Sequence, residues 1–185
     1  MRASSSLTWG GCTIPGDGRV PAVAVSLTGP TAAHARAQAR HAIDAGADVL
    51  ELRVDLLEEV DALVAFTEAP GEESSTTDSM VVTTAAAQVL ECLRRMADVV
   101  DATPLLLTCR TAAEGGRARL DDSGYGALLC SVLDELAGWE PGRRPSAIDV
   151  EVQRGCLPQV SEQAHGLGID VVASFHDFEA TPGDE

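Results

Sequence analysis

Lysine is absent from this 185-residue sequence, and all 13 basic residues are therefore arginine. The 29 acidic residues outnumber them and give a net charge of −16. Proteins that bind nucleic acid need clustered basic residues to contact phosphate, so this charge argues against a nucleic-acid partner. It does not exclude a small anionic ligand, because two or three arginines can attract one locally.

Aromatic residues and cysteine pairs are also scarce. Aromatics make up 3% of the sequence, so alanine, valine and leucine must fill the core. The five cysteines stand at positions 12, 92, 109, 130 and 156, and no two of them have the CxxC spacing of a metal or redox motif. An odd number of cysteines without such spacing indicates reduced and mostly buried thiols in a cytoplasmic protein.

Long apolar segments are missing as well. The first 18 residues contain no apolar stretch of the kind that a signal peptide has. No apolar run is long enough to cross a bilayer. We therefore expect a soluble protein in the cytoplasm, without a membrane partner.

What the sequence does contain is an alternation of two kinds of segment. Five short segments are apolar and rich in β-branched residues, as strands buried on both faces are: 21–27, 48–54, 104–110, 147–152 and 170–175. Four segments have helical character: 31–46, 85–100, 121–138 and 157–168. Thr31 is placed to cap the first helix and Gly46 to end it. The alternation predicts a parallel sheet, either an open doubly wound sheet or part of a (β/α)8 barrel.

Two segments fall outside this alternation in what we expect to be a single domain, residues 1–185. Residues 7–20 predict a β-hairpin whose turn is Pro-Gly-Asp-Gly at 15–18. Residues 69–79 are small, polar and acidic, and they predict a disordered insertion. No glycine-rich phosphate-binding motif follows the first predicted parallel strand, so the sequence does not favour a nucleotide-binding version of the fold.

Polar residues gather toward the carboxyl-terminal parts of the predicted strands, where parallel α/β sheets and barrels build their sites. They are Ser26, Glu51, Arg53, Asp55, Arg110, Glu114, Asp149, Glu151, Ser174 and His176. On the second strand, the alternation of side chains predicts Glu51, Arg53 and Asp55 on one face. Acids, arginines and one histidine suit proton transfer on a polyhydroxylated carboxylic acid, in which arginine binds the acid and His176 moves the proton.

Simpler roles are open for several of these residues. Arg53 and its neighbouring acids could be a structural ion pair. Asp149 and Glu151 could close the end of a barrel through hydrogen bonds, which we favour over direct chemistry. His176 and Asp177 could cap a turn. A metal site is not expected, because no HxxxH or HxH spacing is present.

Four stretches at these strand ends resemble type I 3-dehydroquinate dehydratase: ELRVD, LLLTCRTAAEGG, IDVEV and SFHDFEATP. Their order and spacing match across residues 7–185, apart from the acidic insertion. The resemblance implies a (β/α)8 TIM barrel that dehydrates 3-dehydroquinate to 3-dehydroshikimate in the shikimate pathway of aromatic amino-acid biosynthesis. In that family a lysine forms a Schiff base with the substrate ketone and a histidine moves the proton, without a metal or organic cofactor and often in a homodimer.

The resemblance also implies roles for individual residues. His176 matches the acid/base histidine, and Glu114 matches the acid beside the catalytic pair. The positions that match substrate-binding residues, of which Ser26 does so more weakly, are Ser26, Glu51, Arg53 and Arg110. The family's lysine lies on the sixth strand of the barrel, whereas this sequence has five predicted strands and no lysine. Arginine stays protonated and cannot take its place.

These departures predict an incomplete barrel of about five βα units after the hairpin, without strands six to eight and without dehydratase activity on its own. One alternative is a non-catalytic remnant or a module that binds a hydroxylated carboxylic acid. Two others are an enzyme built on a complete open α/β sheet and an acidic interaction protein.

Overall fold

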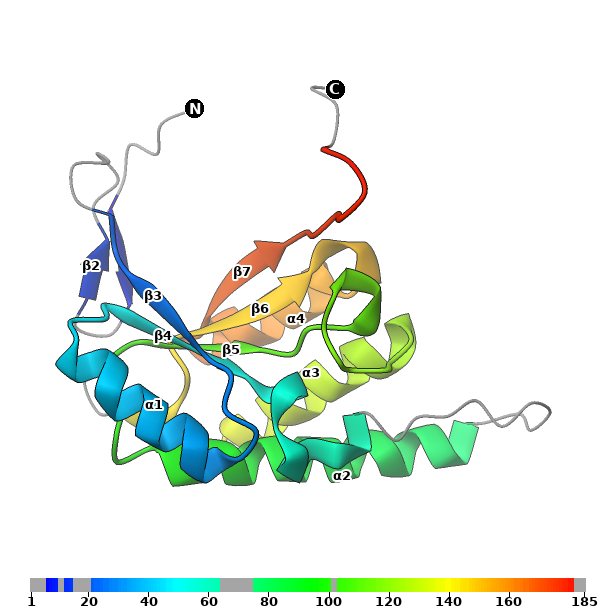
Figure 1. The fold of residues 1–185 in the computed structure, drawn as a ribbon. Helices are drawn as coiled ribbons and strands as arrows, with labels where there is room; N and C mark the ends of the chain where they lie inside the picture. The colour runs from blue at the N-terminus through cyan, green and yellow to red at the C-terminus, as the bar shows by residue number, and fades with distance from the viewer. Residues whose placement is uncertain (1–5, 10–11, 15–20, 64–74, 101–102, 182–185) are drawn as a thin grey trace.

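The computed structural model describes residues 6–9, 12–14, 21–63, 75–100 and 103–181 (Figure 1). Its first element is an antiparallel pair of strands, β1 (Leu7–Trp9) and β2 (Cys12–Ile14), in which Trp9 lies opposite Cys12. The pair lies within the segment for which a hairpin was predicted. The chain reverses between Trp9 and Cys12, earlier than the predicted turn at 15–18, so the position of that turn is corrected. Residues 15–18 lie outside the described part of the chain.

Five parallel strands form the main sheet: β3 (Ala24–Leu27), β4 (Val49–Arg53), β5 (Leu105–Thr108), β6 (Ala147–Glu151) and β7 (Asp170–Ser174). Their order in the sheet is their order in the sequence. A doubly wound sheet changes direction at a switch point, whereas a (β/α)8 barrel adds each strand beside the previous one. The observed order therefore selects the barrel type from the two predicted architectures.

Within the described residues, four α-helices connect the strands and cover one face of the sheet (Figure 1): α1 (Ala32–Asp44), α2 (Ser75–Met96), α3 (Asp122–Leu136) and α4 (Leu157–Gly166). The predicted cap of α1 is confirmed, because the Thr31 hydroxyl accepts a hydrogen bond from the backbone N–H of His34 at 3.2 Å. Gly46 follows that helix with a φ of +93°, a conformation that favours glycine. Short 3-10 helices complete the described elements: η1 (Val54–Leu56), η2 (Glu58–Leu63), η3 (Ala112–Glu114), η4 (Pro141–Arg143) and η5 (Val152–Arg154).

The start of α2 corrects one prediction. The sequence predicted disorder over residues 69–79, but residues 75–79 belong to α2, which begins well before the expected start at 85. Residues 69–74 lie outside the described part of the chain. Once a helix is nucleated, each further residue adds one hydrogen bond at little cost, so a packed helix extends into polar sequence. The packed, buried stripe of α2 is Val82, Ala85, Ala86, Val89, Leu90, Leu93 and Met96.

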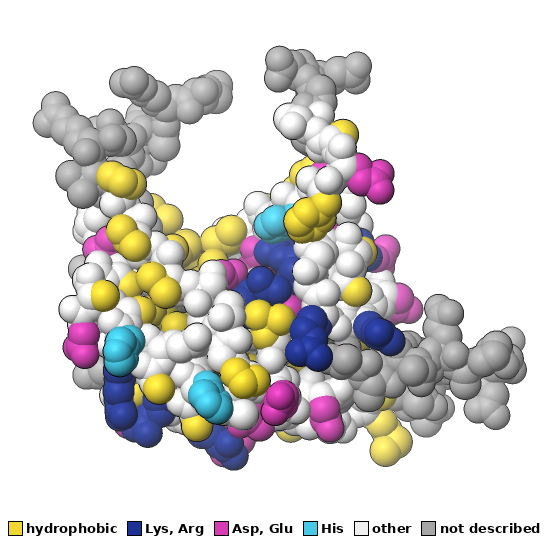
Figure 2. Space-filling view, viewed as in Figure 1, with side chains coloured by type: hydrophobic (Ala, Val, Ile, Leu, Met, Phe, Trp, Pro, Cys, Tyr) yellow, Lys and Arg dark blue, Asp and Glu magenta, His cyan; other side chains and the backbone are white. Residues whose placement is uncertain are grey.

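The two faces of the sheet differ in character. On β4, Leu50 and Leu52 are 0% exposed and belong to the core beneath the helices, while Glu51 and Arg53 point to the other face. Near its amino-terminal edge, that other face is apolar and holds Trp9. Figure 2 shows acidic, basic and histidine side chains gathered in a hollow above the sheet. A group of charged residues therefore lies at one end of the face that the helices leave uncovered.

Candidate active site

The polar residues predicted from the sequence lie at the carboxyl-terminal ends of the parallel strands. They are Ser26 on β3, Glu51 and Arg53 on β4, Arg110 and Glu114 after β5, and His176 after β7. Parallel strands in register bring their carboxyl ends to one edge of the sheet, so these residues share that edge. Their contacts divide them into three groups.

The first group contains His176 and the buried carboxylate of Glu114, which contact each other. His176 Nδ1 lies 3.0 Å from Glu114 Oε2, and the backbone N–H of His176 donates to the same oxygen at 3.1 Å. A carboxylate oxygen accepts hydrogen bonds, so this contact fits the tautomer that donates from Nδ1 and has its lone pair on Nε2. The Glu114 side chain is 1% exposed and the His176 side chain 42%. The carboxylate thus fixes both the tautomer and the position of a ring that reaches solvent.

Two glycines bring the Glu114 loop close to its neighbours. Gly115 has a φ of +80°, and a Cβ at this position would lie 2.6 Å from the Phe178 ring. A Cβ at Gly116 would overlap the carbonyl of Arg110. Residues larger than glycine do not fit at either position without a shift, which explains the Glu-Gly-Gly sequence of the loop.

Arg110 joins Glu114 to two further carboxylates. Its Nη1 donates to Glu114 Oε2 at 3.4 Å and to Glu151 Oε1 at 3.2 Å, and its Nη2 lies 2.9 Å from Asp149 Oδ2. Nη1 also donates to Ser174 Oγ at 2.9 Å. Arg110 is 6% exposed, and charges this deeply buried are tolerated because each has a partner. Arg110 therefore holds the ends of β5, β6 and β7 together.

The two acids on β6 make the structural contacts that the sequence analysis favoured. Glu151 accepts hydrogen bonds from the backbone N–H of Thr111 at 2.8 Å and from its hydroxyl at 2.6 Å. Asp149 accepts one from Ser174 Oγ at 3.0 Å. Burial raises the pKa of Asp149, and the guanidinium of Arg110 opposes this effect only in part. Both acids therefore close the end of the sheet around Arg110.

Arg53 and Asp55 form the second group, a bidentate ion pair with 2.8 Å for both Nε–Oδ1 and Nη2–Oδ2. Its hydrogen bonds to Asp55 raise the pKa of Arg53. The prediction of a shared strand face holds for Glu51 and Arg53 but not for Asp55, because β4 ends at Arg53. Asp55 is buried and accepts the backbone N–H of Arg110 at 3.2 Å and of Arg117 at 3.1 Å. The structural ion pair that the sequence left open is present.

Ser26 and Glu51 form the third group. They lie side by side in the register of β3 with β4, and the Ser26 hydroxyl donates to Glu51 Oε2. Both residues are on the open face of the sheet. In the part of the chain that the structure describes, no hydrogen bond links this pair to Arg110. The pair therefore has polar atoms to offer a ligand without breaking the network around Arg110.

The sequence analysis did not identify Tyr125 and Thr111, both of which form hydrogen bonds with Glu151. Tyr125 is the single tyrosine and is 0% exposed. Its hydroxyl accepts from the backbone N–H of Glu151 at 3.1 Å and donates to the carbonyl of Asp149 at 3.5 Å. Burial raises its pKa, so it stays protonated. The sequence did contain a signal for Tyr125. A tyrosine on the apolar side of a predicted helix is expected to be buried, and a buried hydroxyl needs a hydrogen-bond partner.

Two other kinds of feature were sought in the described part of the chain. There, no three or more histidine, cysteine, aspartate or glutamate side chains are grouped so as to hold a metal ion. None of the described helices is both long and apolar enough to cross a membrane.

Comparison with known sequences links this chain to one family of proteins. A family model described as type I 3-dehydroquinase matches residues 23–185. A 3-dehydroquinate dehydratase of Klebsiella pneumoniae subsp. pneumoniae is 29% identical over 167 residues, which are 88% of this chain and 54% of that protein. One of Bacillus velezensis is 32% identical over 140 residues, which are 75% of this chain and 44% of that protein. The chain spans about half the length of the curated relatives it matches.

Solved structures give the same result for the fold. The type I 3-dehydroquinate dehydratase of Clostridium difficile, crystallised with covalently modified comenic acid, has a TM-score of 0.72 at 25% identity. The match covers 96% of this chain and 58% of that one. The 3-dehydroquinate dehydratase of Geobacillus kaustophilus also has a TM-score of 0.72, at 18% identity, over 97% of this chain and 58% of that one. Both likenesses support the barrel type of sheet that the strand order indicates.

Proposed function

Because this chain belongs to the type I 3-dehydroquinase family, we propose that its strand ends form the acid/base part of a 3-dehydroquinate dehydratase. The observation that carries the proposal is the 3.0 Å contact of His176 with Glu114, next to the buried Arg110. Imidazole is the side chain best suited to take up and return a proton near neutral pH. Here its ring is held by a carboxylate that itself has a charged partner.

In the proposed reaction, His176 Nε2 accepts the proton from C2, the carbon beside the substrate ketone. The same nitrogen then donates a proton to the departing hydroxyl, so that water leaves and a carbon–carbon double bond forms. One histidine is enough, since the proton removed in the first step is returned in the second. Glu114 stabilises the imidazolium that exists between the two steps.

This reaction needs an electron sink, because a ketone alone acidifies the C2 proton too little for a neutral imidazole. An imine with a primary amine provides one. The 185 residues contain no lysine. We therefore propose that the amine belongs to a stretch of polypeptide beyond these residues, and that these residues alone do not catalyse the dehydration.

One oxygen of the Glu114 carboxylate supports the proposal that a further group completes the site. Glu114 Oε1 is buried and has no hydrogen-bond partner among the described residues, although Oε2 of the same carboxylate has several. A buried acceptor without a donor destabilises the folded state by about 1–3 kcal/mol. The site therefore has an acceptor for a donor group that the substrate or the missing amine would bring.

The substrate-binding roles divide between the two arginines. The Arg53 side chain is 21% exposed, whereas that of Arg110 is 8% exposed. In the described part of the chain, Arg53 Nη1 makes no hydrogen bond, while both Nη atoms of Arg110 are bound to carboxylates. We propose that Arg53, Glu51 and Ser26 contact the carboxylate and hydroxyl groups of 3-dehydroquinate. Arg110 would also contact the substrate, while keeping its hydrogen bonds to the carboxylates of the protein.

A second candidate is a module that binds the hydroxylated acid without turning it over. The absence of lysine favours it for this chain alone, since the groups proposed to bind ligand are all present. The two candidates differ when a lysine-bearing segment is supplied, because only a dehydratase then forms product. The cytoplasmic location and the homodimer stay predictions, which fractionation and sedimentation of the complete protein would test.

The test separates binding from imine formation. Calorimetry with 3-dehydroquinate measures binding to the 185-residue chain, and borohydride reduction followed by mass spectrometry detects an imine adduct. We expect binding that Arg53→Ala weakens, and no adduct. In the complete protein with its lysine, His176→Asn should abolish formation of the unsaturated product and leave binding intact. A stable adduct on the 185-residue chain, or full turnover by His176→Asn, contradicts the proposal.

A further inference from the structure

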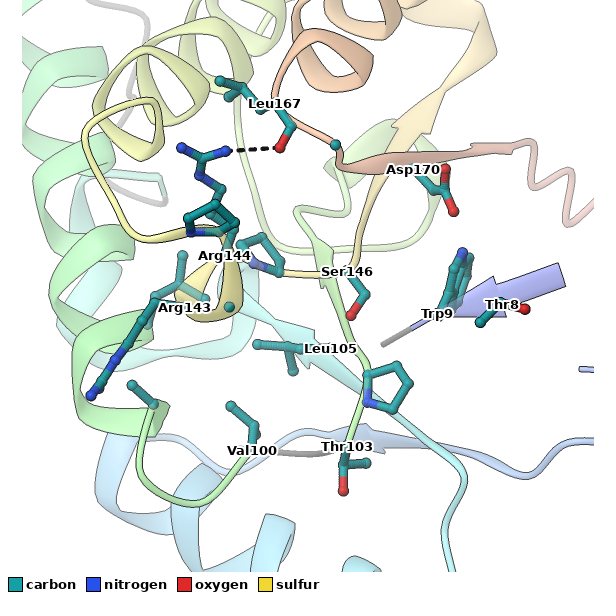
Figure 3. A pocket seen from close by; sticks show the side chains of 17 residues that line it. Thr8, Trp9, Val100, Thr103, Leu105, Arg143, Arg144, Ser146, Leu167 and Asp170 are labelled. Carbon is teal, nitrogen blue, oxygen red and sulfur yellow. Dashed lines mark hydrogen bonds between the residues drawn. The ribbon is translucent and has the colours of Figure 1, made fainter. Parts of the chain in front are cut away.

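A cavity of about 370 Å³ lies at the end of the sheet opposite the candidate active site. Figure 3 shows it between β1 of the hairpin and the loops that enter the parallel strands. Thr8 and Trp9 come from β1, Pro104 and Ser146 precede β5 and β6, and Asp170 begins β7. Its volume is within the range of about 300–1,000 Å³ that small-molecule pockets have.

The indole of Trp9 is the first sign of a ligand in this cavity. Trp9 is 8% exposed and packs with Val49 and Ala147 at the amino-terminal ends of β4 and β6. Among the residues that the structure describes, its Nε1–H has no hydrogen-bond partner. Nearly all buried donors in folded proteins are paired, so an unpaired one that lines a cavity indicates an acceptor inside it.

The chemistry of that acceptor follows from the groups beside the indole. In Figure 3 the nitrogen edge of Trp9 and the carboxylate of Asp170 face the same space, with the Ser146 hydroxyl nearby. A donor and an acceptor that face one space are bridged by a group that both accepts and donates, as a hydroxyl does. Asp170 would repel an anion, and a cation could not accept from the indole.

The arginines that line the cavity do not reverse this preference. The guanidinium of Arg144 donates to four backbone carbonyls, those of Leu136, Ala137, Trp139 and Leu167. Figure 3 shows its bond to Leu167, and it shows Arg143 pointing away from Trp9 and Asp170. No arginine among the lining residues therefore attracts an anion to the space beside the indole.

We propose that this cavity binds a small neutral molecule with several hydroxyl groups. One hydroxyl accepts from Trp9 Nε1–H and donates to the Asp170 carboxylate, and Ser146 contacts a second. The rings of Pro104, Pro141 and Pro145 supply rigid apolar walls for the carbon skeleton. The site is separate from the proposed dehydratase site and stands whether or not that function is correct.

The test compares three six-carbon probes of similar size and different charge: sorbitol, which is neutral, gluconate, which is anionic, and glucamine, which is cationic. These 185 residues contain two tryptophans, so Trp139→Phe leaves Trp9 as their single fluorescent reporter. We expect a saturable change of Trp9 emission with sorbitol and binding at least about tenfold weaker for gluconate, because Asp170 repels its carboxylate. Glucamine keeps the hydroxyls, but its ammonium group cannot accept from the indole, so it should bind no more tightly than sorbitol.

Variants locate the binding. Asp170→Ala should weaken sorbitol binding by about tenfold, and Arg143→Ala, which changes an exposed lining residue that points away, should leave it unchanged. Trp9→Phe, followed by calorimetry, should weaken it as well; if that variant does not fold, Asp170→Asn provides the second measurement. A response that rises linearly without saturation, equal binding of gluconate, or equal binding by Asp170→Ala overturns the proposal and leaves water as the occupant of the cavity.

Discussion

The two ends of the sheet are each organised by one arginine, but the partners of these arginines differ. At the carboxyl-terminal end, Arg110 contacts the carboxylates of Glu114, Asp149 and Glu151. At the amino-terminal end, Arg144 donates to four backbone carbonyls of the α3 and α4 termini at 2.8–3.0 Å. Carbonyls do not titrate and have few alternative partners, whereas carboxylates change charge and can exchange partners. The first network can therefore respond to a ligand, while the second only holds helix ends in place.

Replacing Arg110 by alanine should give the largest effect of the substitutions that test this contrast. It would leave three buried carboxylates without their shared counter-charge, and we expect a loss of about 3–5 kcal/mol in the free energy of unfolding. Urea denaturation measures it. Arg110→Lys is the matched control, since it keeps the charge but not the forked geometry, and should fall between wild type and alanine. A loss below that of Arg144→Ala would contradict the contrast.

Arg144→Ala should have the second largest effect. Its removal leaves carbonyls at the end of α3 without a charged donor, and we expect a loss of about 2 kcal/mol. Because no partner of Arg144 titrates, the loss should be the same at mildly acidic and neutral pH. Arg143→Ala at the neighbouring exposed position is the control and should leave stability unchanged. A strong pH dependence of the Arg144→Ala loss would show that its network is not purely structural.

Gly115→Ala tests the carboxyl-terminal end without changing a charge. An L residue with a φ of +80° costs about 1–2 kcal/mol, and its Cβ would also meet the Phe178 ring. Thermal or urea unfolding should show that loss. In the double variant Gly115→Ala, Phe178→Ala, the overlap disappears and only the backbone strain remains, so part of the loss should be recovered. Equal losses in the single and double variants would rule out the overlap with Phe178.

Asp149→Asn tests whether the Arg110 network depends on pH, and it should have the smallest effect on stability of these substitutions. Burial raises the pKa of Asp149 above its ordinary value of 3.8, so the folded state binds this proton more tightly than the unfolded state. The stability contributed by the neutral carboxyl is complete below that ordinary value and is lost as pH rises through the raised pKa. Asp149→Asn should remove this part of the pH dependence.

Urea denaturation of wild type and Asp149→Asn from about pH 4 to about pH 7 measures the difference. Glu162→Gln, an exposed position on α4, is the control and should keep the wild-type slope. An unchanged slope in Asp149→Asn would mean that Arg110 fully offsets the burial of this carboxylate.

The strands and most helices could be predicted from the sequence because their signals are local. The segment predicted at 147–152 forms a strand at Ala147–Glu151, and the helix predicted at 121–138 forms at Asp122–Leu136. The amino-terminal half of α2 could not be predicted, because its Ser- and Thr-rich sequence by itself favours turns. That segment is helical as the continuation of a helix that is packed further along the chain.

The site was predictable residue by residue but not contact by contact. The apolar runs placed Arg110, Glu114 and His176 at or shortly after the ends of predicted strands, where the structure has them. The contacts of Arg110 with Asp149 and Glu151 of β6 depend on the register of β5 with β6, which no local signal encodes. Asp55 was assigned to a strand face because alternation was extended beyond the last strand residue, Arg53.

The sequential strand order has a consequence for how this chain acquires its shape. In the described part of the chain, each parallel strand after β3 pairs with the strand synthesised just before it, so each of these pairings spans one strand–helix unit. Such a sheet can grow in the direction of synthesis, with β3 and β4 docked before β7 has left the ribosome. A slow codon or a destabilising substitution in β6 would then arrest growth at a defined intermediate, in which β3, β4 and β5 are paired and Arg110 lacks its contacts with Asp149 and Glu151.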